Sequence, residues 1–143
     1  MESPLQFKHI LPVQLRFSDV DQFGHVNNSV YFSLYDLAKT TYIHDVMGRL
    51  LDLEKEAIVV ANVSANFVSP IYYSDNVAIE TTVVHFGTTS FRLEQQAVDI
   101  NTHNVKCTCT TVMVYYDLKS QEPMPISDAF KKAVCKYEGH PID

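Results

Sequence analysis

At 143 residues, the chain has a length at which one domain with one hydrophobic core is expected. Hydrophobic residues make up 46% and charged residues 20%, which argues against disorder and against a fibrous architecture. The 11 basic and 17 acidic residues give a net charge of −6, which opposes binding to nucleic acid.

No apolar run approaches the roughly 20 residues that a membrane helix requires, and the first residues lack a long apolar core after a basic start. We therefore expect a cytoplasmic protein without a membrane partner. The three cysteines, Cys107, Cys109 and Cys135, cannot all pair and lack a metal-binding spacing. Free thiols and no metal are predicted. Cys107 and Cys109 are expected to be buried on one face of a strand.

The first half of the chain predicts a strand, a loop and a long helix. Residues 9–18 predict the strand, because Val13, Leu15 and Phe17 alternate with polar residues. Residues 19–28, DVDQFGHVNN, are rich in the residue types of turns and helix caps. Residues 28–47 have a narrow polar stripe at helical spacing, which predicts a helix largely enclosed by other structure and ended by Gly48.

The second half predicts four strands and a short helix. Residues 59–67 change to a period of two, with one face formed by Val59, Ala61, Val63, Ala65 and Phe67. Three further strands, rich in β-branched residues, are predicted at residues 77–86, 90–100 and 105–117. Residues 127–137 predict a closing helix capped by Ser127. This order predicts an α+β fold over one domain, residues 1–143, in which an antiparallel five-stranded sheet wraps around a long helix.

Residues 19–28 bring carboxylates, an imidazole, amides and a glycine together just before the helix. Free N–H groups at a helix start can bind an oxyanion, such as the one formed when a thioester carbonyl is attacked. A carboxylate beside that carbonyl could attack it or activate a water. The alternative is an ordinary loop, with turn-forming Asp19 and Asp21, helix-capping Asn27 or Asn28, and a structural His25.

Two segments resemble a known enzyme family. RFSDVDQFGHVNNSVYFSLYDLAKTTY (residues 16–42) resembles the opening of the hot-dog thioesterases related to 4-hydroxybenzoyl-CoA thioesterase, in which an Asp-x-Asp-x-x-Gly loop precedes a tyrosine-bearing central helix. FVSPIYYSDNVAIETTV (residues 67–83) resembles the family's second landmark, a strand broken by proline and followed by an acidic turn. The resemblance spans the chain, although only the first motif is specific. It implies a hot-dog fold.

The resemblance also implies an acyl-CoA thioesterase that uses no cofactor. Its catalytic carboxylate would be Asp21, as nucleophile or general base, while the backbone N–H near Asn28 polarises the thioester carbonyl. Gly24 would shape the approach, and Asp19 would be structural. HVNN (residues 25–28) also resembles a string in acyl-carrier-protein thioesterases, so both carriers stay open. His25 would orient the substrate or a water, or serve only the helix entry.

The other polar residues carry weaker signals. His85, His103 and Glu94 have no motif spacing, and Asp75 is expected in a structural turn. A second hypothesis is therefore kept, a non-catalytic hot-dog module that binds acyl groups or partner proteins. Exposed sheet edges are usually covered by pairing, which predicts at least a dimer. Because similar hot-dog proteins often pair again into tetramers, the resemblance implies a homodimer or a homotetramer. In similar hot-dog proteins, such pairing builds two active sites across the interface.

Overall fold

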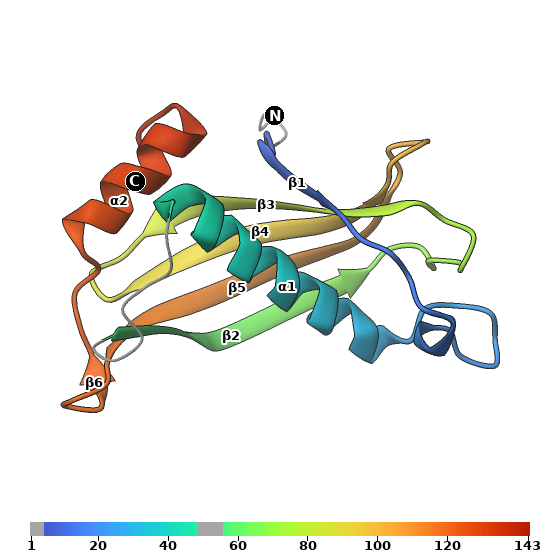
Figure 1. Cartoon of the computed structure of the whole chain (residues 1–143), viewed down its shortest axis with the longest axis horizontal. Helices are drawn as coiled ribbons and strands as arrows, with labels where there is room; N and C mark the ends of the chain where they lie inside the picture. Colours follow the sequence, from blue (N-terminus) through green and yellow to red (C-terminus); the bar gives the residue numbers. More distant parts are fainter. Residues whose placement is uncertain (1–4, 49–55) are drawn as a thin grey trace.

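The computed structural model describes residues 5–48 and 56–143 (Figure 1). The predicted segment between the helix and the second strand, residues 49–56, lies almost entirely outside the described residues. The elements, in chain order, are β1 (His9–Pro12), a 3-10 turn η1 (Phe17–Asp19), α1 (Asn28–Met47), β2 (Glu56–Phe67), β3 (Val77–Phe86), β4 (Ser90–Asp99), β5 (Val105–Asp117), β6 (Glu122–Pro123) and α2 (Asp128–Glu138).

The strands form one antiparallel sheet in the order β1-β3-β4-β5-β2, and the short β6 pairs with β5. α1 crosses one face of this sheet, and α2 covers one end (Figure 1). A sheet curved around a long central helix is the hot-dog arrangement that the resemblance implied. The five main strands were predicted, whereas the two-residue β6 was not.

The first strand is shorter than predicted. β1 ends at Pro12, and the chain then turns at η1 because the carboxylate of Asp19 accepts hydrogen bonds from the backbone N–H of Arg16 at 2.8 Å and from its guanidinium at 3.0 Å. The apolar alternation continues through this turn only in part. Leu15 is buried, but Phe17 is 87% exposed. The prediction for residues 13–18 is therefore wrong, since local side-chain hydrogen bonds override the strand pattern.

The central helix begins and ends at the predicted residues. Asn27 caps its start, and Gly48, with a φ of +70°, ends it by donating its N–H to His44 O at 2.9 Å. The predicted polar stripe is exposed, as expected. Phe32, Leu37 and Lys39 depart from the expected pattern of enclosure, and Phe32 is 37% exposed. Leu37 is 53% exposed, whereas Lys39 is 5% exposed, with its ammonium 3.2 Å from Asp36 Oδ1.

The prediction that one face of β2 carries Val59, Ala61, Val63, Ala65 and Phe67 is wrong, because the strand contains a bulge. The pairing with β5 shifts between Val60 and Asn62, so Val63 pairs with Thr111 while Val59 pairs with Val114. Because opposite residues share a face and faces alternate along β5, Val59 and Val63 lie on different faces. The one-residue insertion cannot be seen in an apolar alternation.

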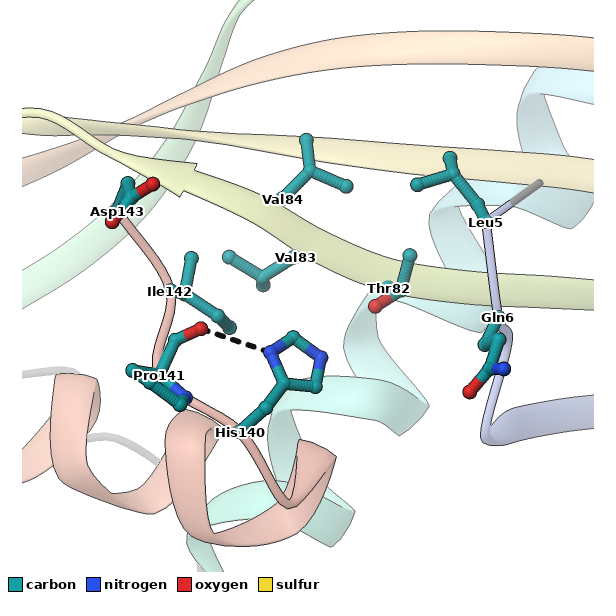
Figure 2. A pocket seen from close by; sticks show the side chains of 9 residues that line it. All are labelled: Leu5, Gln6, Thr82, Val83, Val84, His140, Pro141, Ile142 and Asp143. Carbon is teal, nitrogen blue, oxygen red and sulfur yellow. Dashed lines mark hydrogen bonds between the residues drawn. The ribbon is translucent and has the colours of Figure 1, made fainter. Parts of the chain in front are cut away.

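The outer edge of β3 is only partly covered. β1 pairs with residues 78–81, and further along the edge Phe86 N–H donates to Asp143 O at 2.7 Å. Between these contacts, residues 82–84 line a hollow of about 380 Å³ together with residues 5–6 and 140–143 (Figure 2). This hollow belongs to the end of the sheet near α2, and none of the predicted site residues lines it.

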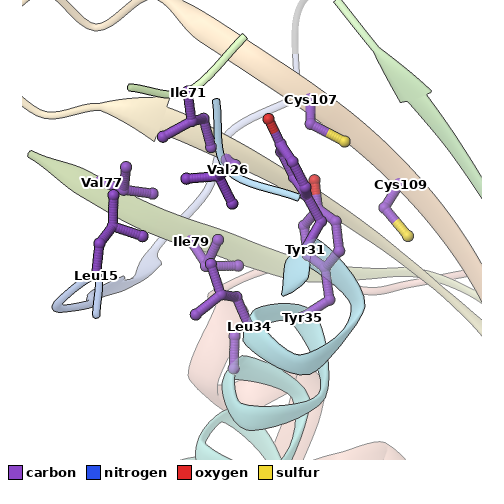
Figure 3. Packing of buried hydrophobic residues seen from close by; sticks show 12 residues of the cluster. Leu15, Val26, Tyr31, Leu34, Tyr35, Ile71, Val77, Ile79, Cys107 and Cys109 are labelled. Carbon is purple, nitrogen blue, oxygen red and sulfur yellow. The ribbon is translucent and has the colours of Figure 1, made fainter. Parts of the chain in front are cut away.

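Two buried clusters fill the space between α1 and the sheet. The first, near the start of the helix, includes Tyr31, Leu34 and Tyr35 of α1 and both thiols of β5, Cys107 and Cys109 (Figure 3). The prediction that these cysteines are buried on one face is confirmed. The second cluster surrounds Phe130 of α2 and lies at the other end of the helix. The first cluster is the one that supports the predicted site.

Candidate active site

The loop between η1 and α1 closes on itself through backbone hydrogen bonds. Val20 and Val26 form an isolated bridge, and within it Asp21 N–H donates to His25 O at 2.9 Å. Gly24 N–H donates to Asp21 O at 3.0 Å. Gly24 has a φ of +82°, and a Cβ there would meet no atom within 4 Å, so the turn requires glycine for its backbone conformation alone.

One oxygen of the Asp21 carboxylate holds this loop together. Oδ1 accepts the backbone N–H of Phe23 at 2.9 Å and that of His25 at 3.4 Å. Among residues 5–48 and 56–143, no hydrogen bond reaches the other oxygen, Oδ2. The half-buried carboxylate is thus fixed by one oxygen and has the other available.

The start of α1 leaves one backbone donor unused. Asn27 Oδ1 accepts Ser29 N–H at 3.1 Å, and Asn27 O accepts Val30 N–H at 2.9 Å. The N–H of Asn28 has no acceptor within the part of the chain that the structure describes. It lies at the positive end of the helix dipole, where an oxyanion is stabilised.

A pocket of about 280 Å³ opens beside this donor. It is lined by His25, Val26, Asn28, Tyr31 and residues 67–70. Of the predicted site residues, His25 and Asn28 therefore share one pocket. Asp21 and Gly24 do not line it, but they form the loop that carries His25.

The opposite wall of the pocket comes from the segment after β2. Val26 N–H donates to Ile71 O at 2.8 Å, and His25 forms an isolated bridge with Tyr72. The rings of His25 and Tyr72 meet edge to face with centroids 5.2 Å apart. Sequence reasoning did not assign Tyr72 to the site. The available signal was the proline-broken landmark, FVSPIYYSD, which marks this segment as irregular.

Two aromatic rings, those of Tyr31 and Phe67, line the pocket. Tyr31, which is buried, meets Phe67 edge to face with centroids 5.1 Å apart. Burial raises the pKa of the Tyr31 phenol. This phenol is therefore neutral. Tyr31 was predicted only as an apolar residue of the helix.

The remaining polar candidates lie elsewhere or have structural partners. Asp19 is buried: burial acts to raise its pKa, but hydrogen bonds from Arg16 outweigh this effect, so the pKa is lowered. Asp75 Oδ2 accepts Tyr72 N–H at 2.8 Å, which confirms the predicted turn. His103 and Glu94 border another hollow, of about 340 Å³. His85 is exposed on β3.

Thiol and metal chemistry find little support in the described residues. Burial raises the pKa of the Cys107 and Cys109 thiols, which keeps them protonated and poorly nucleophilic. Across residues 5–48 and 56–143, no three His, Cys, Asp or Glu side chains gather in a way that could hold a metal ion. In the same ranges, no helix has the length and apolar character needed to cross a membrane.

The fold defines the class of protein: a hot-dog protein in which the loop that holds Asp21 leads into the central helix. A family model, described as the Thioesterase-like superfamily, matches residues 15–134, so the chain belongs to this superfamily and is a thioester hydrolase.

Individual relatives agree with this assignment. YneP of Bacillus subtilis (strain 168), whose name describes it as a candidate acyl-CoA thioesterase, is 20% identical over 132 residues, covering 88% of this chain and 92% of YneP. A thioesterase from Thermus thermophilus, solved with coenzyme A and Zn, is 28% identical, with a TM-score of 0.83 over 95% of this chain and 98% of that one. A thioesterase-superfamily protein from Jannaschia sp. CCS1 is 19% identical, with a TM-score of 0.85 over 98% and 89% of the chains, and shows the shared fold.

Proposed function

We propose that the protein hydrolyses an acyl-CoA thioester, with Asp21 as the catalytic carboxylate and the N–H of Asn28 as the donor to the carbonyl oxygen. The observation that carries this proposal is the unused N–H of Asn28 on the pocket that His25 also lines, while His25 is hydrogen-bonded to Asp21. Donor and carboxylate thereby belong to one short loop and the helix start that follows it.

In the proposed mechanism, the carbonyl oxygen binds at Asn28 N–H, where the helix dipole stabilises the charge that develops on attack. Asp21 Oδ2 then acts in one of two ways. As a general base it removes a proton from a water that attacks the carbonyl carbon, and the proton is passed to the departing thiolate. As a nucleophile it forms an anhydride and expels the thiolate, and water later cleaves the anhydride to the free acid.

The acyl group would occupy the pocket beneath the helix start. Its apolar lining, Val26, Tyr31, Phe67 and Pro70, suits an apolar or aromatic acyl group. CoA is the proposed carrier, supported by the name of YneP and by the coenzyme A bound to the Thermus thioesterase. An acyl carrier protein is the alternative carrier, supported by the resemblance of HVNN (residues 25–28) to a string in acyl-carrier-protein thioesterases.

We also propose that the working form is a homodimer, or a homotetramer built from dimers. β2 is an edge strand, and it exposes apolar side chains at Val60, Val63 and Phe67. Phe32 and Leu37 expose further apolar surface on α1. Pairing of two copies along β2 would cover this edge. A reducing, cytoplasmic location is proposed because all three cysteines are free.

Free-thiol release from a panel of acyl-CoA and acyl-carrier thioesters tests the substrate assignment. We expect turnover on acyl-CoA members, while turnover restricted to carrier-bound acyl groups would overturn the choice of CoA. A single turnover in heavy-oxygen water tests the anhydride route. Label in the Asp21 carboxylate supports it, because water then attacks the aspartyl carbon of the anhydride. Label only in the product acid fits both general-base catalysis and water attack at the acyl carbon of the anhydride.

A further inference from the structure

We propose that Lys106 and Asp75 are a positioning pair, which holds the pocket wall against His25 and through it orients the Asp21 carboxylate. The inference rests on the proposed role of Asp21. It adds two residues that touch neither the pocket nor the substrate site but fix the segment between them.

The pair is largely buried in a chain where basic residues are few. Lys106 Nζ lies 3.6 Å from Asp75 Oδ2, and the two side chains are 12% and 18% exposed. Removing both charges from water has a cost that largely offsets their attraction, so a pair of this kind adds little net stability. The pair contributes through geometry, because it fixes the position of the turn at Asp75 relative to β5, which carries Lys106.

Asp75 passes this constraint to Tyr72. Its Oδ2, the oxygen that faces Lys106, accepts the backbone N–H of Tyr72 at 2.8 Å. In return, Asp75 N–H donates to Tyr72 O at 2.9 Å. The turn of residues 72–75 is closed from both sides, and the ammonium of Lys106 holds the carboxylate that closes it.

Lys106 also fixes the other end of the same segment. Its backbone oxygen accepts the N–H groups of Val68 at 2.9 Å and Ser69 at 3.0 Å. Residues 68–75 have no helix or strand of their own, and residues 68–70 line the pocket. One residue of β5 therefore braces this irregular segment at its start through the backbone and at its turn through the side chain.

The constraint reaches the catalytic loop through Tyr72. Tyr72 bridges His25 through the backbone, and their rings meet edge to face at 5.2 Å. His25 in turn donates its N–H to Asp21 Oδ1 and accepts the N–H of Asp21. Lys106, Asp75, Tyr72, His25 and Asp21 thus form a continuous series of direct contacts.

NMR tests the positioning role without depending on activity, since the ring protons of His25 report the nearby Tyr72 ring. Lys106→Met should move these resonances in the direction that Tyr72→Leu moves them, and Lys106→Arg should restore them. Lys132→Met, on the exposed side of α2, is the matched control and should leave them unchanged. Unmoved His25 resonances in Lys106→Met would overturn the inference, whatever the outcome for Asp21.

Kinetics test whether this effect reaches the reaction. We expect Lys106→Met to lower kcat about tenfold, because small displacements of reacting groups are costly. The kcat of the Lys106→Met/Tyr72→Leu enzyme should be no more than about twofold below that of the less active single variant. This is the result expected for residues that act through one another. A kcat loss in the double variant equal to the product of the two single losses would contradict the proposal. If Lys106→Met does not fold, Asp75→Asn takes its place in both experiments, because its side chain keeps an oxygen for Tyr72 N–H while losing the charge.

Discussion

Asp21 and His25 are joined by a reciprocal pair of hydrogen bonds, in which Asp21 N–H donates to His25 O at 2.9 Å and His25 N–H donates to Asp21 Oδ1 at 3.4 Å. The same carboxylate oxygen accepts Phe23 N–H. The loop therefore uses Oδ1 for its hydrogen bonds, which leaves Oδ2 for the proposed chemistry. Changes that disturb the loop and changes that remove the charge should have different effects.

The turn at Gly24 can be tested against a glycine of nearly the same conformation. Gly24 and Gly139 have φ values of +82° and +83°, and neither would bring a Cβ closer than 3.9 Å to another atom. Alanine at either position should cost about 1–2 kcal/mol of stability, the typical cost of a left-handed residue. Only Gly24→Ala should also lower kcat, because Gly139 ends α2 far from the loop. Equal kcat losses in the two variants would contradict the account.

The helix start offers a second matched pair. Asn27 caps α1 and Ser127 caps α2, each by accepting a backbone N–H from the first turn. Alanine at either cap should destabilise the protein by about 0.5–2 kcal/mol in denaturant unfolding. Asn27→Ala should in addition lower kcat several-fold, because the free N–H of Asn28 loses its fixed direction. A normal kcat in Asn27→Ala would argue against this donor.

Acid should weaken the contact between β1 and the end of α1. The hydrogen bond from His9, at 2.8 Å, is the largest cause that lowers the pKa of Asp45. A lowered folded pKa adds stability above the unfolded value of about 3.9, and this contribution is lost as the pH falls through the folded pKa. The loss of unfolding free energy between pH 6 and pH 3 should thus be smaller in Asp45→Asn than in the parent. Identical pH profiles in urea unfolding would show that the contact contributes nothing.

The two edges of the sheet should respond differently to charge. Val63 on β2 and Ile10 on β1 are both exposed apolar residues of edge strands. Lysine on an edge strand opposes pairing. Light scattering at micromolar concentration should show that Val63→Lys is a monomer with reduced activity, while Ile10→Lys keeps the parent's assembly. An active monomeric parent would remove the reason for the proposed dimer.

Periodicity predicted the long elements well, because their signals are repeated over many residues. Asn27 and Gly48 bound the helix as capping chemistry requires, and three strands follow their β-branched runs. The predictions were wrong where a few local contacts determine the path of the backbone. The Asp19 hydrogen bonds turn the chain at residues 16–19, where a strand was predicted, and the bulge after Val60 reverses a face of β2.

The site could be predicted only along one stretch of chain. Asp21, Gly24, His25 and Asn28 lie within a short motif, so the sequence brings them together by itself. The opposite wall comes from residues 67–70, and the contact of the following Tyr72 with His25 depends on tertiary structure. Tyr72 could not be found from spacing, because the bridge to His25 joins residues almost fifty positions apart.

The kcat of Asp21→Asn tests the central claim most directly. Asparagine keeps an oxygen for the N–H groups of Phe23 and His25, so the fold and the assembly should be retained. It cannot act as base or nucleophile, so kcat should fall by about 10²–10⁴-fold. Asp19→Asn is the comparison: it should lower the melting temperature, since Asp19 holds Arg16, while costing less in kcat. A kcat of Asp21→Asn within about threefold of the parent, well below the effect of catalytic proton transfer, would contradict the assignment of Asp21.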